Sequence, residues 1–441
     1  MLASRIILFC AVILTPSLTI ATTEGYEVTF PLWTTMFFGA LILSIAFVPL
    51  INDEWWGKNY RYVSLGLALP AIWIVSARDI SLIINTLIEY LSFIILLGSL
   101  FIIAGGIVIR TSVRGSPKFN SIFLMVGAIF ASLIGTTGAS MVLIRPLIRA
   151  NRWRKHVSHI FIFFIFLVSN IGGVLTPLGD PPLFLGFLKG VPFLWSLSLI
   201  PFWLLAVSIL VAIFYVLDRH FLKKETLDAD SIIPDGTVVR RLEIRGKINF
   251  FFLAAVLVAF FLPPVMREMV MIGSSLLSIY FTPVVLREEN AFTYHPIIVV
   301  AVLFAGIFLT MIPAIKILET NGGRLGVDTP WKFFWMSGGL SSFLDNAPTY
   351  LIFMSVAKSI AWTKHISTGL IAGVPEAFLK AISVGSVFMG ANTYVGNGPN
   401  FMVKAICEEN GISMPSFFGY IVWSLVFLIP LFFVITLVFF L

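Results

Sequence analysis

Cysteine and charged residues are both scarce in this sequence of 441 residues. Only Cys10 and Cys407 are present, one near each end, so neither a disulfide framework nor a cysteine-based metal site is indicated. Asp, Glu, Lys and Arg together make up 12% of the chain, against 59% hydrophobic residues. A soluble fold could not hide that much apolar surface, so the composition indicates a membrane protein.

Motifs of several soluble protein classes are also absent. The chain contains no G-x-x-x-x-G-K-[ST] loop for nucleotide phosphates and no H-E-x-x-H metal motif. ATP is therefore not expected as the energy source. No nucleophile–base pair indicates an enzyme, no resident cofactor is expected, and the net charge of +7 implies no nucleic-acid partner.

Long uncharged apolar runs are what the sequence has instead. A membrane-spanning helix needs about 17 to 25 apolar residues, and continuous runs indicate helices rather than the alternating strands of a membrane barrel. The expected fold is therefore an all-α polytopic membrane protein. The runs that reach or approach the required length are 31–52, 92–109, 196–217, 269–286, 296–315 and 416–441.

The first 21 residues fit two outcomes. Arg5, an apolar stretch over 6–14 and a small-residue tract at 19–22 are typical of a cleavable signal peptide. An uncleaved first helix fits the same residues.

Basic residues mark the loops expected on the cytoplasmic side of the membrane. They cluster at 110–118, 149–155 and 219–247. Because both flanks of 120–148 are basic and its apolar run breaks at 135–138, this segment is predicted to be a re-entrant hairpin. A short amphipathic piece over 80–90 is predicted to lie along the outer surface before the span 92–109.

The same order of segments recurs after residue 248, entering from the opposite side of the membrane. A hairpin over 331–358, broken at 345–348, precedes a broken helix over 376–406, just as 120–148 precedes a broken helix over 157–189. We therefore predict two inverted-topology repeats, each with a re-entrant hairpin and a discontinuous transmembrane helix. The predicted divisions are the signal peptide or first helix 1–21, a first repeat 22–217, a cytoplasmic linker 218–248 and a second repeat 249–441.

A residue-level echo supports the repeat. When 169–184 is placed over 386–401, an offset of 217 residues, six of the sixteen pairs are identical. The identities are Ser, Gly, Thr, Gly, Pro and Phe, most of which are polar or helix-breaking. Paired discontinuous helices of a transporter predict that placement.

Four breaks at comparable depth indicate one shared polar site, because an unpaired peptide group in hydrocarbon costs several kcal/mol. Two acids lie within the breaks, Asp180 and Asp345. A carboxyl group buried in a membrane is expensive to ionise, which suits a group that holds either H⁺ or a metal ion. Alternatively, each Asp only caps the following half-helix by accepting backbone N–H bonds. The two roles can coexist.

Side chains around the breaks complete the candidate site. Their oxygens can replace the water shell of a small cation, while half-helix N-termini offer positive dipole ends to an anion. The predicted ion- or substrate-binding residues are Thr137, Ser169, Asn170, Gly173, Thr176, Asp180, Asp345, Asn346, Thr349, Asn392, Thr393 and Asn397, with Asp180 and Asp345 as ligands of transported Na⁺.

Over 169–182 and 390–400 the sequence resembles the ion transporter superfamily, in particular citrate-transporter-like proteins and NhaD-type sodium/proton antiporters. The resemblance covers nearly the whole chain after 1–21. It implies a homodimer in which a substrate-carrying domain moves against a fixed scaffold. Carboxylate transporters of this superfamily carry Ser-Asn-Thr in each hairpin tip, whereas the tips here read Thr-Thr-Gly at 136–138 and Asp-Asn-Ala-Pro-Thr at 345–349. With the two acids, this difference favours cations over dicarboxylates.

The leading hypothesis is therefore a secondary active Na⁺/H⁺ antiporter of the bacterial inner membrane, with the lipid bilayer and small ions as its partners. The alternative is a Na⁺-coupled citrate or dicarboxylate symporter. An ion channel could also use polar breaks, but two inverted repeats with opposed hairpins suit alternating access better.

Overall fold

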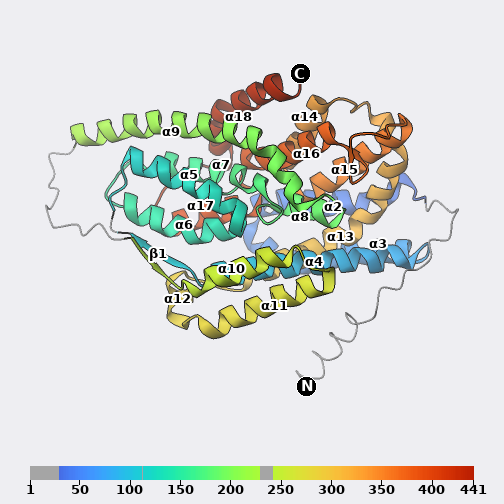
Figure 1. Cartoon of the computed structure of the whole chain (residues 1–441), viewed down its shortest axis with the longest axis horizontal. Coiled ribbons are helices and arrows are strands. Elements are labelled where there is room, and N and C mark those ends of the chain that lie inside the picture. Colours follow the sequence, from blue (N-terminus) through green and yellow to red (C-terminus); the bar gives the residue numbers. More distant parts are fainter. Residues whose placement is uncertain (1–28, 112, 229–241) are drawn as a thin grey trace.

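The computed structural model describes residues 29–111, 113–228 and 242–441. Almost all of its regular structure is helical (Figure 1). Seven helices in these ranges are long and apolar enough to cross a membrane, which confirms the prediction of an all-α polytopic membrane protein. The predicted signal peptide or first helix, 1–21, lies outside the described residues.

Two short antiparallel ribbons are the strands found in the described ranges. Strand β1 (Val108–Thr111) pairs with β2 (Leu242–Arg245), and so joins two segments more than a hundred residues apart. Strand β3 (Leu370–Ile371) pairs with β4 (Val374–Pro375) in a tight hairpin. Neither ribbon forms a sheet that could hold a core, so the fold depends on helix packing.

One layer of the molecule is built from helices of both halves of the sequence. Helix α3 packs on α13, α10 on α11, and α4 on both α11 and α13; Figure 1 shows α4, α10 and α11 along the lower side of the view. The elements of this layer are η1 (Leu32–Thr35), α2 (Met36–Ile51), α3 (Asp53–Ser76), α4 (Ile80–Ala104), α10 (Ile248–Ala259), α11 (Pro264–Phe281), α12 (Val284–Glu289) and α13 (His295–Asn321).

Helix α4 corrects one detail of the predicted topology. It is a single helix of 25 residues, so the separate surface piece predicted over 80–90 is wrong. No Gly or Pro interrupts it before Gly98. Its apolar stripe packs against protein, since Ile83 is buried in a cluster with Val75 and Ser92 donates a hydrogen bond to the buried Glu268 of α11 (2.8 Å).

The second layer contains the hairpins and the interrupted helices. Its first-half elements are α5 (Pro117–Ile134), α6 (Thr136–Asn151), α7 (Ser158–Leu167), η2 (Ile171–Leu175), α8 (Pro181–Leu188), η3 (Phe193–Leu199) and α9 (Ile200–Asp228). Its second-half elements are η4 (Gly322–Leu325), α14 (Pro330–Ser341), α15 (Asn346–Thr363), α16 (Glu376–Met389), η5 (Gly390–Asn392), α17 (Gly398–Glu409) and α18 (Phe417–Phe439). Because α9 reaches Asp228, the predicted linker 218–248 begins inside a helix; the division itself stays a prediction.

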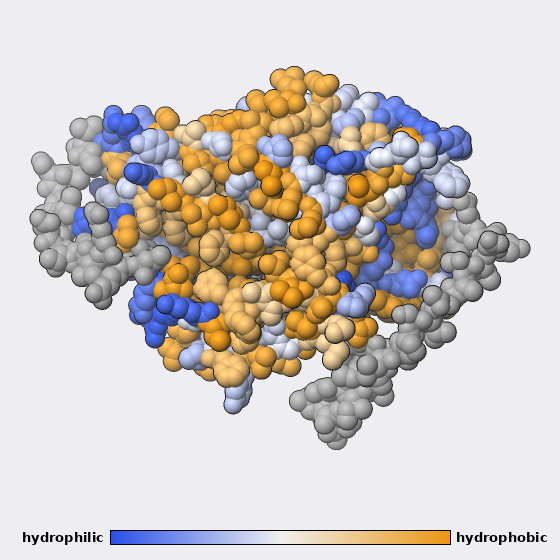
Figure 2. All heavy atoms as spheres, in the orientation of Figure 1, coloured by the Kyte–Doolittle hydropathy of each residue, from blue (hydrophilic) through white to orange (hydrophobic). Residues whose placement is uncertain are grey.

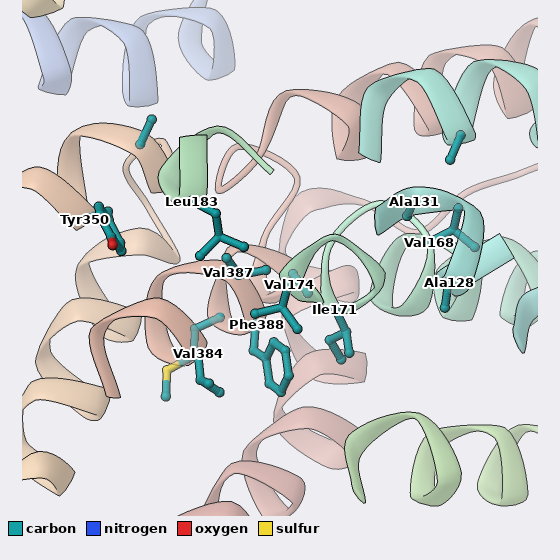
Figure 3. Close-up of a cluster of buried hydrophobic side chains, with 14 of the residues drawn as sticks. Ala128, Ala131, Val168, Ile171, Val174, Leu183, Tyr350, Val384, Val387 and Phe388 are labelled. Carbon is teal, nitrogen blue, oxygen red and sulfur yellow. The ribbon is translucent and has the colours of Figure 1, made fainter. Parts of the chain in front are cut away.

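The centre of the second layer is apolar and draws on both halves. All of α7 from His159 to Leu167 is buried, and η2 contacts α16. Figure 3 shows Ile171 and Val174 of η2 beside Val387 and Phe388 of α16. The helix interruptions therefore lie inside protein, where freed peptide groups can find partners, and not against lipid.

The surface has the distribution expected of a membrane protein. Figure 2 shows apolar residues across the middle of one face and hydrophilic residues gathered toward its ends. Large apolar side chains are exposed along whole helices, for example Leu276, Tyr280 and Phe281 of α11. Such continuous apolar exposure is rare on soluble monomers and is the ordinary condition of a helix in lipid.

An ion pair outside the spanning helices ties the β1–β2 ribbon to α12. Arg110 donates to Glu289 through Nε (2.6 Å) and Nη2 (2.8 Å), and this guanidinium lowers the pKa of Glu289 below its ordinary value of 4.5. A carboxylate whose pKa is lowered by folding stabilises the fold above that ordinary value. The contribution is lost as the pH falls through the lowered pKa.

We expect Arg110→Gln to reduce the free energy of unfolding by about 0.5–1 kcal/mol near neutral pH, because the pair is partly exposed to solvent. The difference from wild type should shrink below pH 4.5, where Glu289 takes up a proton. Thermal unfolding of detergent-purified protein on both sides of that pH measures the effect, with the exposed Arg114 as an Arg114→Gln control. The same difference at both pH values would contradict this assignment.

Candidate functional site

The two interrupted helices have nearly the same backbone conformation. Thr176, after η2, is extended (φ −144°, ψ 157°), and so is Thr393 after η5 (φ −138°, ψ 166°). Asp180 precedes α8 with φ −146° and ψ 142°, and Asn397 precedes α17 with φ −153° and ψ 138°. Each pair is separated by the same 217 residues as the sequence echo.

A serine from the first hairpin closes the first interruption. The hydroxyl of Ser132, in the last turn of α5, donates to the carbonyl oxygen of Gly172 and accepts from the backbone N–H of Leu175 (3.2 Å). The backbone carbonyl of Ser132 accepts from the hydroxyl of Thr176. One residue of the hairpin thus satisfies three polar groups of the interrupted helix.

Ser342 does the same in the second half. Its hydroxyl donates to the carbonyl of Met389 (3.2 Å) and its carbonyl accepts from the hydroxyl of Thr393 (2.5 Å). The donor to the Ser342 hydroxyl is here the side-chain amide of Asn392 (2.9 Å), in place of a backbone N–H. Because peptide groups inside a membrane protein need partners, these serines hold each hairpin to its interrupted helix.

Close backbone approach within each interruption leaves no room for a side chain. A Cβ added to Gly179 would collide with the carbonyl of Gly173, and a Cβ added to Gly396 would collide with the carbonyl of Gly390. Gly173, predicted as a site residue, therefore serves the path of the backbone. Only glycine permits this contact.

Asp180 lies where three of the four breaks meet. Its Oδ1 accepts a hydrogen bond from Thr136 Oγ1 (2.9 Å) at the tip of the first hairpin and from Asn397 Nδ2 (3.3 Å) in the second interruption. Its Oδ2 accepts from Asn346 Nδ2 at the tip of the second hairpin. The carboxylate makes no capping hydrogen bond to α8.

The surroundings of Asp180 contain donors but no paired positive charge. The residue is 1% exposed, and within the described ranges no Lys, Arg or His forms an ion pair with it. The Oδ1 atom of Asn346 is also buried, without a hydrogen-bond partner among the described residues. A buried carboxylate without a counter-charge is costly, so this arrangement suits a proton or a small cation.

Asparagine side chains extend the polar cluster behind Asp180. Asn397 Nδ2 also donates to the carbonyl of Ser169 (3.1 Å) and to Asn170 Oδ1 (3.2 Å). Asn170 Nδ2 donates to Asn400 Oδ1 (2.7 Å). These bonds join the two interrupted helices directly, across more than two hundred residues of sequence.

A sequence profile described as "putative citrate transport" matches residues 27–440, nearly the whole chain. The chain belongs to this citrate-transport family. Among its relatives are two proteins named as uncharacterized transporters, from Mycobacterium bovis and Mycobacterium tuberculosis. Each is 25% identical over 411 residues, which cover 84% of this chain and 91% of the relative. Family and fold together make the chain a multi-pass membrane transporter, which agrees with the expectation that it is not an enzyme.

Other predicted residues of this citrate-transport family member lie nearby in different roles. Asp345 caps α15 by accepting from the N–H of Ala347 (3.1 Å), and Thr349 donates to the backbone carbonyl of Asp345 (3.2 Å). Asp345 and Asp180 share no hydrogen-bond partner within the described part of the chain. Thr137 lines a cavity of about 70 Å³ between the hairpin tip, α4 and α13.

Sequence reasoning missed Thr136, Ser132 and Ser342. Thr136, and not the neighbouring Thr137, contacts Asp180. A signal for the serines was present, since each stands four residues before a hairpin-tip residue, Ser132 before Thr136 and Ser342 before Asn346. That shared spacing within two hairpins becomes informative only when the hairpins are compared with each other.

We expect Gly179→Ala to lower the free energy of unfolding by about 1–3 kcal/mol, because an added methyl group overpacks the interruption. Gly398→Ala is the matched control, since a Cβ there meets nothing within 4 Å. Thermal unfolding in detergent compares the two variants with wild type. If both variants were equally stable, the close backbone approach would not constrain the site.

Proposed function

We propose that the chain is a secondary transporter that exchanges Na⁺ for H⁺ by alternating access, with Asp180 as the group that both ions share. The observation that carries this proposal is the wholly buried carboxylate held by three uncharged donors from three helix breaks. Its negative charge is balanced by a proton or by Na⁺. Because one carboxylate cannot serve both fully at the same time, the two ions compete.

The donors around Asp180 suit both states of such an exchange. Asn346 and Asn397 present amide nitrogens to the carboxylate, and a half-turn of either amide would present an oxygen instead. An oxygen can accept from a protonated Asp180 or bind Na⁺. The hydroxyl of Thr136 can likewise donate to the carboxylate or offer a lone pair to a cation.

The repeated contacts support two inverted-topology repeats, each with a re-entrant hairpin and a discontinuous helix. Helices α8 and α17 begin 217 residues apart, as do α9 and α18, and the Ser132 and Ser342 contacts repeat within that frame. Inverted repeats that meet at the bilayer midplane are a common transporter architecture. The basic loops and mycobacterial relatives support a bacterial inner-membrane location, and a homodimer follows from the family resemblance alone.

A Na⁺-coupled citrate or dicarboxylate symporter is the second candidate, because the family description refers to citrate. In this case the same oxygens would bind Na⁺ and the hairpin tips would hold the organic acid. The lack of a paired cation at Asp180 favours the antiporter, since a multiply charged anion beside that carboxylate would be repelled.

We expect Asp180→Asn to abolish Na⁺-driven proton movement, because the amide cannot exchange a proton. Everted vesicles that carry a ΔpH measure this as loss of its dissipation on addition of Na⁺, with Li⁺, K⁺, citrate and succinate tested alongside. Wild-type dissipation of the ΔpH by Na⁺ supports the antiporter. Labelled citrate or succinate uptake that depends on Na⁺, without such dissipation, would replace it by the symporter.

Asp345→Asn, in the same assay, decides the role of the second acid. Asn caps a helix about as well as Asp, so retained exchange would identify Asp345 as a cap, and lost exchange would identify it as a second ion-binding carboxylate.

We expect Thr136→Val to weaken the apparent affinity for Na⁺ about tenfold or more, because it removes a hydroxyl from Asp180 while keeping a similar shape; a hydrogen bond to a charged group contributes about 1.5–3 kcal/mol. Thr137→Val is the matched control on the adjacent residue, where the hydroxyl does not contact Asp180. The Na⁺ concentration for half-maximal ΔpH dissipation gives the comparison. A larger effect at Thr137 would place the ion in the neighbouring cavity instead.

A further inference from the structure

Buried polar atoms without a partner gather on one side of Asp180. Within the described ranges, the hydroxyls of Tyr350, Ser383 and Ser386 and the Oδ1 of Asn346 lack a hydrogen-bond partner, although all four residues are fully buried. Each such group costs about 1–3 kcal/mol when nothing compensates it. Their concentration on α15 and α16 calls for a functional explanation.

These groups form a file that leads away from Asp180. Asn346 contacts Asp180, and Tyr350 follows it by four residues on α15, so their side chains are neighbours on one helix face. The Tyr350 hydroxyl faces Ser383 across the packed helices α15 and α16, without the geometry of a formed hydrogen bond. Figure 3 shows Tyr350 extending from α15 near Leu183 of α8 and Val384 of α16.

Both ends of the file are defined. A Cβ on Gly186 of α8 would collide with the Tyr350 hydroxyl, so glycine at that position keeps space for the hydroxyl beside the half-helix that follows Asp180. Beyond Ser383, one turn of α16 leads to Lys380, which pairs with Glu376 at 2.9 Å. These two side chains are 29% and 43% exposed, so the file reaches solvent-accessible charged groups.

The first half of the molecule lacks such a file. Ser140 stands four residues after the tip residue Thr136, as Tyr350 stands after Asn346, and Ser169 corresponds to Ser386 at the 217-residue offset. The hydroxyls of Ser140 and Ser169 bond to each other at 2.8 Å. The counterpart of Ser383 is Phe166, which has no proton to pass. The polar file is therefore one-sided.

We propose that Tyr350 and Ser383, positioned next to Asn346, conduct the proton between Asp180 and the Glu376–Lys380 end of α15 and α16. The inference rests on the proposed exchange at Asp180. Each hydroxyl accepts a proton on its oxygen from one neighbour and releases its own to the next, directly or through a bridging water, so no net charge or redox change remains on the protein. Na⁺ does not use this file, because its diameter requires the larger opening between the hairpin tips.

The test separates proton delivery from Na⁺ binding in proteoliposomes. Purified wild type, Tyr350→Phe and Ser383→Ala are compared in two assays: Na⁺-driven proton movement, followed by an entrapped pH dye, and exchange of radioactive Na⁺ for Na⁺ at equal pH. Tyr90→Phe is the matched control, since its hydroxyl donates to a carbonyl in the other layer (2.8 Å).

We expect the two variants to slow proton movement about tenfold or more, as positioned proton-transfer groups do, while Na⁺/Na⁺ exchange and the Tyr90→Phe control stay at wild-type rates. Unchanged proton movement in both variants would overturn the proton file. So would an equal fall in both assays, which would identify a structural role. If wild type itself showed no Na⁺-driven proton movement, the exchange function would fall, which is a distinguishable result.

Discussion

The structure depends on the rule that a backbone polar group inside a membrane protein must have a partner. Two helices stop and restart in the middle of the second layer, and each leaves carbonyl and N–H groups that lipid could not satisfy. Ser132 and Ser342 supply those partners from the hairpins, with Thr176 and Thr393 returning a bond to each. Each hairpin and its interrupted helix are consequently one unit, and neither would be stable without the other.

This arrangement brings Asp180 into contact with residues from three breaks. The hairpin tips deliver Thr136 and Asn346 to its two oxygens, and the second interruption delivers Asn397. All three donors are neutral, so they orient the carboxylate without cancelling its charge. The electrostatic demand for a counter-ion is then met by what the protein transports, which links the satisfaction of the backbone to the proposed exchange.

The two halves share a frame but differ in chemistry. Asp180 corresponds to Asn397, with the same extended backbone, so one half contributes the acid and the other an amide that contacts it. Ser140 and Ser169 bond to each other, whereas Tyr350 and Ser386 are left without partners in the described structure. A symmetric frame supports alternating access, while asymmetric side chains give the two approaches to the site different properties.

The sequence by itself determined the membrane class, the positions of the helix breaks and the family, because long apolar runs and clustered Gly, Pro and polar residues are local signals that lipid makes unambiguous. It also placed Asp180, Asn346 and Asn397 among the site residues. Only the tertiary structure decided that α4 continues through 80–90, that Thr136 rather than Thr137 contacts Asp180, and that Asp345 caps a helix. These outcomes depend on which face of each helix meets its neighbour, and that choice is made by packing between segments far apart in the chain.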